Sequence, residues 1–285
     1  MKDHLMGKNQ IDKFRRVADE LTTAIASCEN VVGIVLIGGL VRGFADRFSD
    51  VDIIALIGRD SRDLRRKIRD LGLDAEKRWR IDVDLEVHFI TDFEKWKWEE
   101  ADRWEFSKAR IVFDPYGRVK KTFKEKLRLS EGFWVKRIVI AAEYLKWYCC
   151  PPRKGVGTIA EAWVERGDLL SAHYCVNYGI DLFVRMLFAL NKEFVPAPKW
   201  RVFYSYTLRW MPANYKSLLR EALQAKDFSL KELRRRLKAL NRLWRESIPR
   251  IENETGLTLE KSSQYYVQEV LHQSEMSKKM IRHTS

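Results

Sequence analysis

The spacing of hydrophobic and polar residues divides the chain into two parts. Up to residue 129, apolar runs of strand length alternate with stripes at helical spacing. They predict strands at 31–37, 51–57, 81–90 and 109–113, and helices at 10–28, 40–44, 59–71, 91–98 and 119–129. From residue 130 onward the strand signals stop, and helices are expected at 131–150, 158–191, 215–225, 229–246 and 259–276. We therefore expect an α/β domain at residues 1–129 and an all-helical domain at residues 130–285.

The composition is that of a soluble globular protein. Hydrophobic residues make up 46% and charged residues 33% of the 285 residues, so the chain can bury a core and is not disordered. The first fourteen residues contain no apolar signal core, and the longest apolar runs are interrupted by Glu143, Lys146 and Arg185. We expect no membrane span and a cytoplasmic location.

The chain is strongly basic, with a formal net charge of +13 and an isoelectric point of about 9.5. This excess suits a nucleic acid partner, but it also suits an enzyme that binds a triphosphate. The densest basic run, at 231–250, fits the solvated face of a helix better than a nucleic-acid surface. The four cysteines lack metal-site spacing, and we interpret them as buried reduced thiols.

Two aspartates open the second predicted strand. Asp50 and Asp52 are two residues apart, so their side chains share one face of an extended chain. Like charges this close resist joint ionisation, and burying them uncompensated is costly. A divalent cation relieves both costs, and the pair therefore predicts a metal site.

The neighbouring segments add to this site. Gly38 and Gly39 end the preceding strand, where a backbone without Cβ can turn sharply and approach a ligand closely. The amides at the start of the short helix that follows are suited to phosphate. On the third predicted strand, Asp82, Asp84 and Glu86 share one face, within reach of the aspartate pair if the two strands are neighbours.

Together these segments resemble the signature of the polymerase-beta-like nucleotidyltransferase superfamily. The matching residues are Gly38-Gly39-x-x-Arg42-Gly43, then Ser49-Asp50-Val51-Asp52, then a third acid in Leu85-Glu86-Val87. Gly39 stands where the family usually has Ser, so backbone amides would hold the phosphates without that hydroxyl. Residues 191–200 resemble, more loosely, the helical C-terminal domain of antibiotic nucleotidyltransferases of the aminoglycoside or lincosamide type.

The resemblance implies an α+β fold class, with a mixed sheet flanked by helices followed by a helical bundle domain. It also implies Mg²⁺-dependent transfer of a nucleoside monophosphate, AMP from ATP, to a hydroxyl of a small-molecule acceptor. Two Mg²⁺ ions would stabilise the attacking and leaving oxygens. Asp50 and Asp52 would bridge both ions and Glu86 would complete the catalytic metal site, with Asp84 as its competitor. The nucleotide-binding residues would be Gly38, Gly39, Arg42 and Ser49.

The acceptor is left open by the sequence. Four polar residues, Asp168, His173, Asn177 and Asp181, lie near helical spacing and could line a pocket for a cationic, aminoglycoside-like substrate. Internal hydrogen bonds on a packed helix explain each of them better. An RNA or protein acceptor would suit the basic charge. A non-enzymatic nucleotide-binding or antitoxin-type partner is a third hypothesis, against which the presence of all three acids argues.

Overall fold

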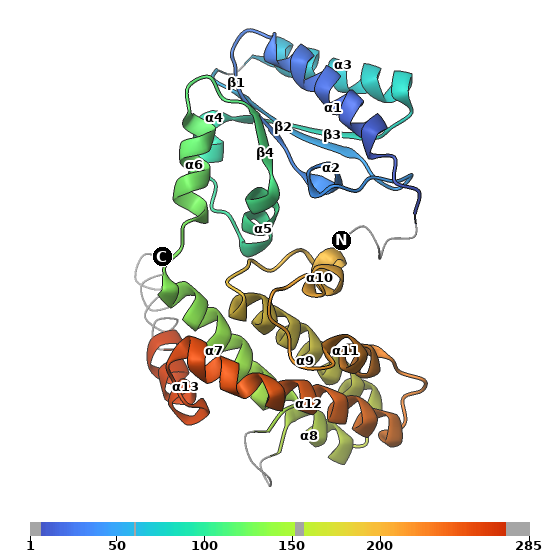
Figure 1. Cartoon of the computed structure of the whole chain (residues 1–285), viewed down its shortest axis with the longest axis vertical. Helices are drawn as coiled ribbons and strands as arrows, with labels where there is room; N and C mark the ends of the chain where they lie inside the picture. The colour runs from blue at the N-terminus through green and yellow to red at the C-terminus, as the bar shows by residue number, and fades with distance from the viewer. Residues whose placement is uncertain (1–6, 60, 152–156, 272–285) are drawn as a thin grey trace. The chain divides into compact units, whose positions relative to one another are not determined.

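The chain forms two compact units, Met1–Leu129 (unit 1) and Ser130–Ser285 (unit 2), shown in Figure 1. The computed structural model describes residues 7–59, 61–151 and 157–271.

Unit 1 is built on a mixed four-stranded sheet with the order β3-β2-β1-β4. The strand β1 (Val31–Leu36) is antiparallel to both β2 (Val51–Ile57) and β4 (Arg110–Phe113). The strand β2 is parallel to β3 (Val83–Phe89), and the helix α3 (Arg62–Trp79) provides the crossover that a parallel pair requires. The mixed sheet confirms the expected α+β class.

Helices cover both faces of this sheet (Figure 1). The helices α1 (Ile11–Ala26) and α3 pack on one face, against a core that includes Ile53. On the other face lie α4 (Ile90–Lys95), α5 (Glu100–Lys108) and α6 (Arg118–Leu127), around an aromatic core that contacts Ile54. Because consecutive residues of β2 are buried on opposite faces, this strand is continuously apolar after Asp52.

The helix α5 was not predicted from the sequence. Its residues mix aromatic and charged side chains without a clear apolar stripe. The helix nevertheless begins at a capping box, in which the Glu99 N–H donates to the Asp102 carboxylate at 2.9 Å and the Glu99 side chain accepts from the Asp102 N–H. This local feature and the burial of Trp104 and Phe106 account for the helix.

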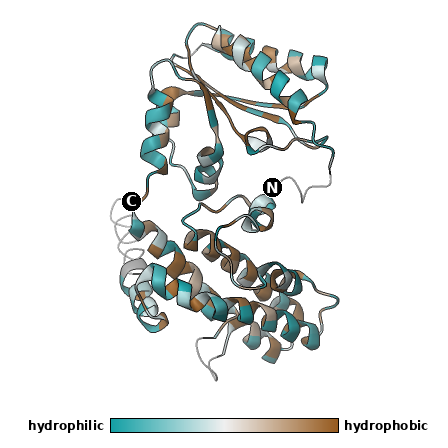
Figure 2. Cartoon of the chain, in the orientation of Figure 1, coloured by the Kyte–Doolittle hydropathy of each residue, from teal (hydrophilic) through white to brown (hydrophobic). Residues whose placement is uncertain are grey.

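All regular structure described in unit 2 is helical. Its elements are α7 (Glu131–Tyr148), α8 (Ile159–Glu165), α9 (Leu169–Leu190), α10 (Pro198–Ser205), α11 (Tyr215–Leu223), α12 (Leu230–Thr255), α13 (Leu259–Tyr265) and a π-helical segment (Tyr266–Leu271). The helix α9 is buried along most of its length, and it packs against α7, α8 and α12. The hydrophobic colouring of α7 and α9 in Figure 2 marks this core.

The prediction of a single helix at 158–191 is wrong, because a turn interrupts the helix between α8 and α9. Gly167 has a φ of 81°, which L side chains rarely adopt. Asp168 then caps α9, since its carboxylate accepts the Ser171 N–H at 3.0 Å. The helix α10 was not predicted, and residues 272–276 of the last expected helix lie outside the described residues.

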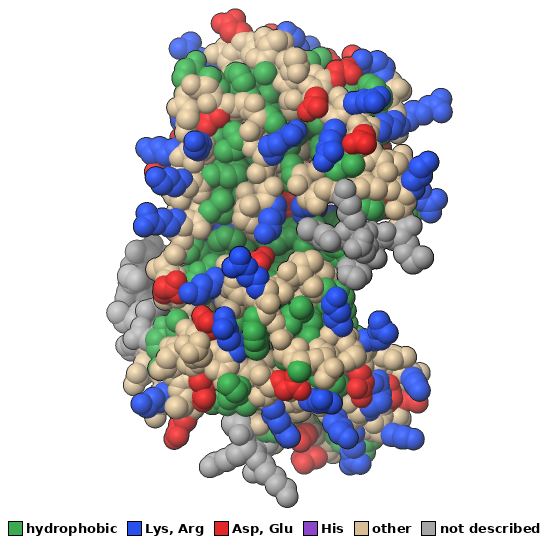
Figure 3. Space-filling view, viewed as in Figure 1, with side chains coloured by type: hydrophobic (Ala, Val, Ile, Leu, Met, Phe, Trp, Pro, Cys, Tyr) green, Lys and Arg blue, Asp and Glu red, His purple; other side chains and the backbone are tan. Residues whose placement is uncertain are grey.

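The prediction of buried reduced thiols is confirmed. Cys28, Cys149, Cys150 and Cys175 are all buried and free. The basic run at 231–250 lies on α12 and presents an exposed stripe of Lys231, Arg234, Lys238, Arg242 and Arg245. Lysines and arginines are scattered among acidic side chains over the face drawn in Figure 3. Within the described ranges, no helix is long and apolar enough to cross a membrane.

Candidate active site

The Gly-Gly turn lies directly against Asp52 in unit 1. The turn leads from β1 into the short helix α2 (Gly38–Arg42), and Gly38 has a φ of 74°. A Cβ atom at Gly38 would lie 1.6 Å from Oδ2 of Asp52, so only glycine fits beside this carboxylate. The Ile37 N–H donates to the Asp52 carbonyl at 3.2 Å and holds the turn against β2.

The register of β2 and β3 places Asp84 beside Asp52. The two residues are direct partners in this parallel pair, so their side chains point to the same face. Glu86 is instead the partner of Ile54, two residues further along the strand. The sheet therefore brings the third strand's acids next to the aspartate pair, as the sequence predicted, and it places Asp84 nearer than Glu86.

Glu86 also has a partner of its own. Its Oε2 lies 2.6 Å from His88 Nε2, and its side chain is 48% exposed. Asp84 and Glu86 are both exposed on β3, so the register with Asp52 and the contact between Glu86 and His88, rather than burial, make Asp84 the better candidate for a site shared with Asp52.

The electrostatics of the site reflect crowding of negative charge. Burial raises the pKa of Asp52 to about 7, and the charges of Asp50, Glu105 and Asp84 add to the rise while Arg42 opposes it. Partial desolvation also raises the pKa of Asp84, and the charges of Glu86 and Asp50 add to the rise. The acids around Asp52 thus outnumber the positive charge that balances them.

Glu105, on α5, is the residue of this site that the sequence did not reveal. Its Oε1 accepts the Gly38 N–H at 2.6 Å and also accepts from Nη1 of Arg42 at 2.5 Å. The Arg42 guanidinium in turn lies over the Trp104 ring, 5.1 Å from its centroid. No motif surrounds Glu105, and its helix was not predicted, so no sequence signal pointed to it.

The remaining predicted nucleotide-binding residues lie on the same turn or in the loop before β2. The backbone carbonyl of Gly39 accepts a hydrogen bond from the Phe44 N–H at 3.3 Å, which closes the loop after α2. Ser49 Oγ accepts the Asp46 N–H at 3.0 Å and lies 3.3 Å from Asp46 Oδ1. In this structure Ser49 shapes the loop that delivers Asp50 to the start of β2.

The donor set fits a hard divalent cation. Carboxylate oxygens are the ligands that Mg²⁺ prefers, and substrate phosphates commonly complete its coordination. The raised pKa of Asp52 shows that neighbouring carboxylates act on one another across the site. Among the described residues, no group of three or more His, Cys, Asp or Glu side chains is already arranged to hold a metal ion.

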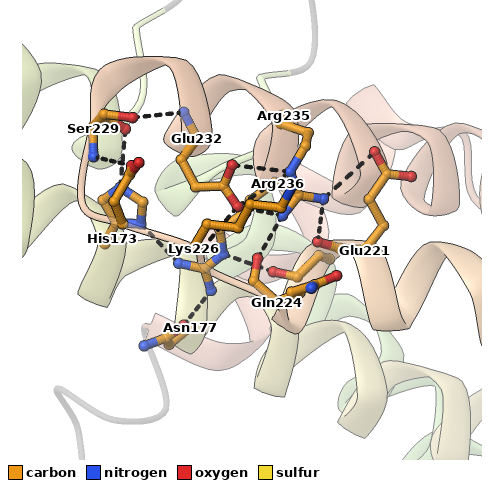
Figure 4. A network of polar contacts seen from close by, with 11 residues as sticks. His173, Asn177, Glu221, Gln224, Lys226, Ser229, Glu232, Arg235 and Arg236 are labelled. Carbon is orange, nitrogen blue, oxygen red and sulfur yellow. Dashed lines mark hydrogen bonds and ion pairs between the residues drawn. The ribbon is translucent and has the colours of Figure 1, made fainter.

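The four polar residues of α9 and its cap are held by contacts within unit 2. Asp168 caps the helix. His173 Nδ1 and Asn177 Oδ1 both contact the buried guanidinium of Arg236, as Figure 4 shows. Asp181 forms ion pairs with Arg185 and Arg201. Their side chains therefore have structural partners, and the arginines around Asp181 offset the charge that would attract a cationic substrate.

Comparison with known proteins identifies the class. Residues 14–111 match the family model described as a nucleotidyltransferase domain. The match spans the Gly-Gly turn, the aspartate pair and β3. Unit 1 therefore contains a nucleotidyltransferase domain of the polymerase-beta-like superfamily. No curated protein matches the chain.

Several solved structures are similar at low identity. A nucleotidyltransferase-like protein from Exiguobacterium sibiricum is 10% identical, with a TM-score of 0.41 over 84% of this chain and 77% of that one. A mutant of the MntA–HpeT toxin–antitoxin is 14% identical, with a TM-score of 0.30 over 45% of this chain and 95% of that one. A tri-AMPylated Shewanella oneidensis HEPN toxin in complex with the MNT antitoxin is 12% identical, with a TM-score of 0.29 over 47% and 98%. The narrower resemblance to antibiotic nucleotidyltransferases stays a prediction.

Proposed function

We propose that unit 1 transfers a nucleoside monophosphate, AMP from ATP, to a hydroxyl group of an acceptor. The observation that supports this most directly is the contact between the Gly38 turn and Asp52, with Asp84 in register beside Asp52. A phosphate-binding turn and a carboxylate cluster on adjoining elements are what in-line transfer at an α-phosphate requires.

In this proposal Asp50, Asp52 and Asp84 hold divalent cations, with Asp84 taking the position that the sequence assigned to Glu86. Two Mg²⁺ ions, when bound with the nucleotide, would supply the positive charge that stabilises the attacking and leaving oxygens. The amides of the Gly38–Gly39 turn and the Arg42 guanidinium bind phosphate oxygens. Asp84 is placed beside the metal-binding pair and accepts the proton of the acceptor hydroxyl.

The acceptor proposed is a small molecule with a hydroxyl group. The positive charges of an aminoglycoside-like acceptor would have to bind residues other than Asp168 and Asp181, because both of these side chains are engaged within unit 2. The net charge of +13 makes RNA the alternative acceptor. Binding of RNA should weaken steeply as salt is added, and a flat salt response would eliminate this alternative.

Labelled ATP distinguishes the proposed reaction from phosphoryl transfer. With Mg²⁺ and a panel of neutral, cationic and RNA acceptors, label from the α-phosphate should appear in a product, while label from the γ-phosphate should appear only in pyrophosphate. Asp50→Asn and Asp52→Asn should each abolish the transfer, and Asp12→Asn, at an 85% exposed side chain, should not affect it. Transfer of the γ-label, or full activity in both site variants, would contradict the proposal.

A further inference from the structure

A carboxylate of the protein fills an anion-binding position in unit 1. The Gly38 N–H and the Arg42 guanidinium converge on one oxygen, Oε1 of Glu105. A backbone amide next to a guanidinium is a common way to bind a phosphate oxygen. Two donors of the phosphate-binding turn are thus already occupied by an internal anion.

The two donors are held in place by contacts other than Glu105. The Arg42 guanidinium lies against the ring of Trp104, which is only 1% exposed and therefore fixed in the core. The turn at Gly38 is held by Asp52, whose carbonyl accepts the Ile37 N–H. Both donors would keep their directions if the Glu105 carboxylate moved away. Glu105 itself is 23% exposed in its side chain and has three rotatable bonds.

Two anions cannot share this position. A nucleotide phosphate that reached the Gly38 N–H would meet the Glu105 carboxylate at hydrogen-bond distance from the same donors. Leaving the buried donors without an acceptor costs free energy, so the empty site favours Glu105, and a phosphate can satisfy the same donors when it arrives.

We propose that Glu105 is an internal competitor of the donor nucleotide, which holds the phosphate position in the free enzyme and is displaced when the triphosphate binds. This inference rests on the proposed function. It assigns to Glu105 a regulatory role, since any contact that draws its carboxylate away from Arg42 would raise nucleotide affinity.

A purely supporting role for Glu105 predicts the opposite effect on binding. If Glu105 only braces Arg42 and the turn, its removal should loosen the phosphate site and weaken the nucleotide complex. The sign of the affinity change therefore separates the two roles.

The test is calorimetric titration of the full chain with α,β-methylene ATP and Mg²⁺, and separately with inorganic tripolyphosphate. Glu105→Gln and Glu105→Ala should each lower the Kd for both probes about tenfold, the scale of one charge-assisted hydrogen bond. Glu94→Gln is the matched control, because it also removes a carboxylate that is paired with an arginine in unit 1. Glu94 forms a bidentate ion pair with Arg118. Its Kd values should equal those of the wild type.

The outcomes separate this inference from the proposed function. An unchanged or higher Kd in both Glu105 variants, with nucleotide still bound by the wild type, overturns the competitor role and leaves the proposed function standing. Absence of binding in the wild type and in both variants overturns both. Binding detected only in the Glu105 variants supports the competitor role.

Discussion

Asp52 and Asp84 lie side by side on neighbouring parallel strands, in direct register. Their pairing brings together acids that lie on separate segments of the sequence, and the Gly38 turn closes over Asp52 from the adjoining strand. The proposed catalytic centre is therefore a property of the sheet register, and a change of register by one residue would turn these side chains to the opposite face.

The register predicts which acid on β3 is essential. Asp84→Asn should lower the rate of label transfer on the order of a hundredfold or more, because it removes a charge beside Asp52. Glu86→Gln should change the rate by no more than about threefold, since it alters an exposed contact with His88. Steady-state rates with α-labelled ATP measure both. The reverse order of effects would restore Glu86 as the third carboxylate.

The crowding of acids around Asp52 should lower the stability of the folded protein when no metal is bound. Because burial and neighbouring charges raise the pKa of Asp52, its ionised form at pH 8 destabilises the folded protein. Asp52→Asn should raise the stability of the metal-free protein by about 1–3 kcal/mol, or several degrees in Tm. Thermal unfolding in chelator at pH 8 tests this. A lower Tm than the wild type, with Asp12→Asn unchanged, would show that Asp52 is stabilising.

The stability of unit 2 should depend on pH in the acid range, through Glu232. Hydrogen bonding to Arg235 lowers the pKa of Glu232 to about 2, and the Lys226 N–H and nearby positive charges add to the effect. Since the folded pKa lies below the ordinary value of 4.5, this contact stabilises the fold above pH 4.5 and loses its effect as the pH falls towards 2. Glu232→Gln should therefore lower the Tm at pH 7, and the difference from the wild type should shrink below pH 4. A constant difference at all pH values would contradict the assignment.

The buried guanidinium in Figure 4 should be essential to unit 2. Arg236 is 1% exposed and donates to the Ala222 carbonyl at 2.7 Å and to His173 Nδ1 at 2.9 Å, besides Asn177. Arg236→Leu leaves these acceptors buried without their donor and should cost about 2–4 kcal/mol in the free energy of unfolding. Arg234→Leu, at an exposed position on the same helix, is the control. Equal Tm values for the two variants would show that the network adds no stability.

The strands and the aspartate pair of the candidate site could be predicted from the sequence because their evidence is local. The alternation through Asp82, Asp84 and Glu86 shows one face of a strand, and the two glycines precede the aspartates at a recognisable spacing. The choice between Asp84 and Glu86 could not be made in this way. It depends on how β3 is shifted along β2, which sequence periodicity does not specify.

Glu105 and the helix break at Gly167 are two further features that sequence periodicity could not predict. Glu105 meets Gly38 through the packing of α5 on the sheet, 67 residues away in sequence, and α5 has no clear apolar stripe. Gly167 looked like one residue within a long helical stripe, but its left-handed backbone and the cap at Asp168 start a new helix. In both cases tertiary or backbone geometry decided what the pattern left undetermined.

We propose that Asp50 and Asp52 bind a divalent cation together with a nucleotide. Water proton relaxation in the presence of Mn²⁺ and α,β-methylene ATP tests it without knowledge of the acceptor, because relaxation is enhanced when the metal–nucleotide complex binds a protein. We predict strong enhancement with the wild type, Glu86→Gln and Asp12→Asn, and none with Asp50→Asn or Asp52→Asn. Wild-type enhancement in both aspartate variants would contradict the metal site and the function built on it.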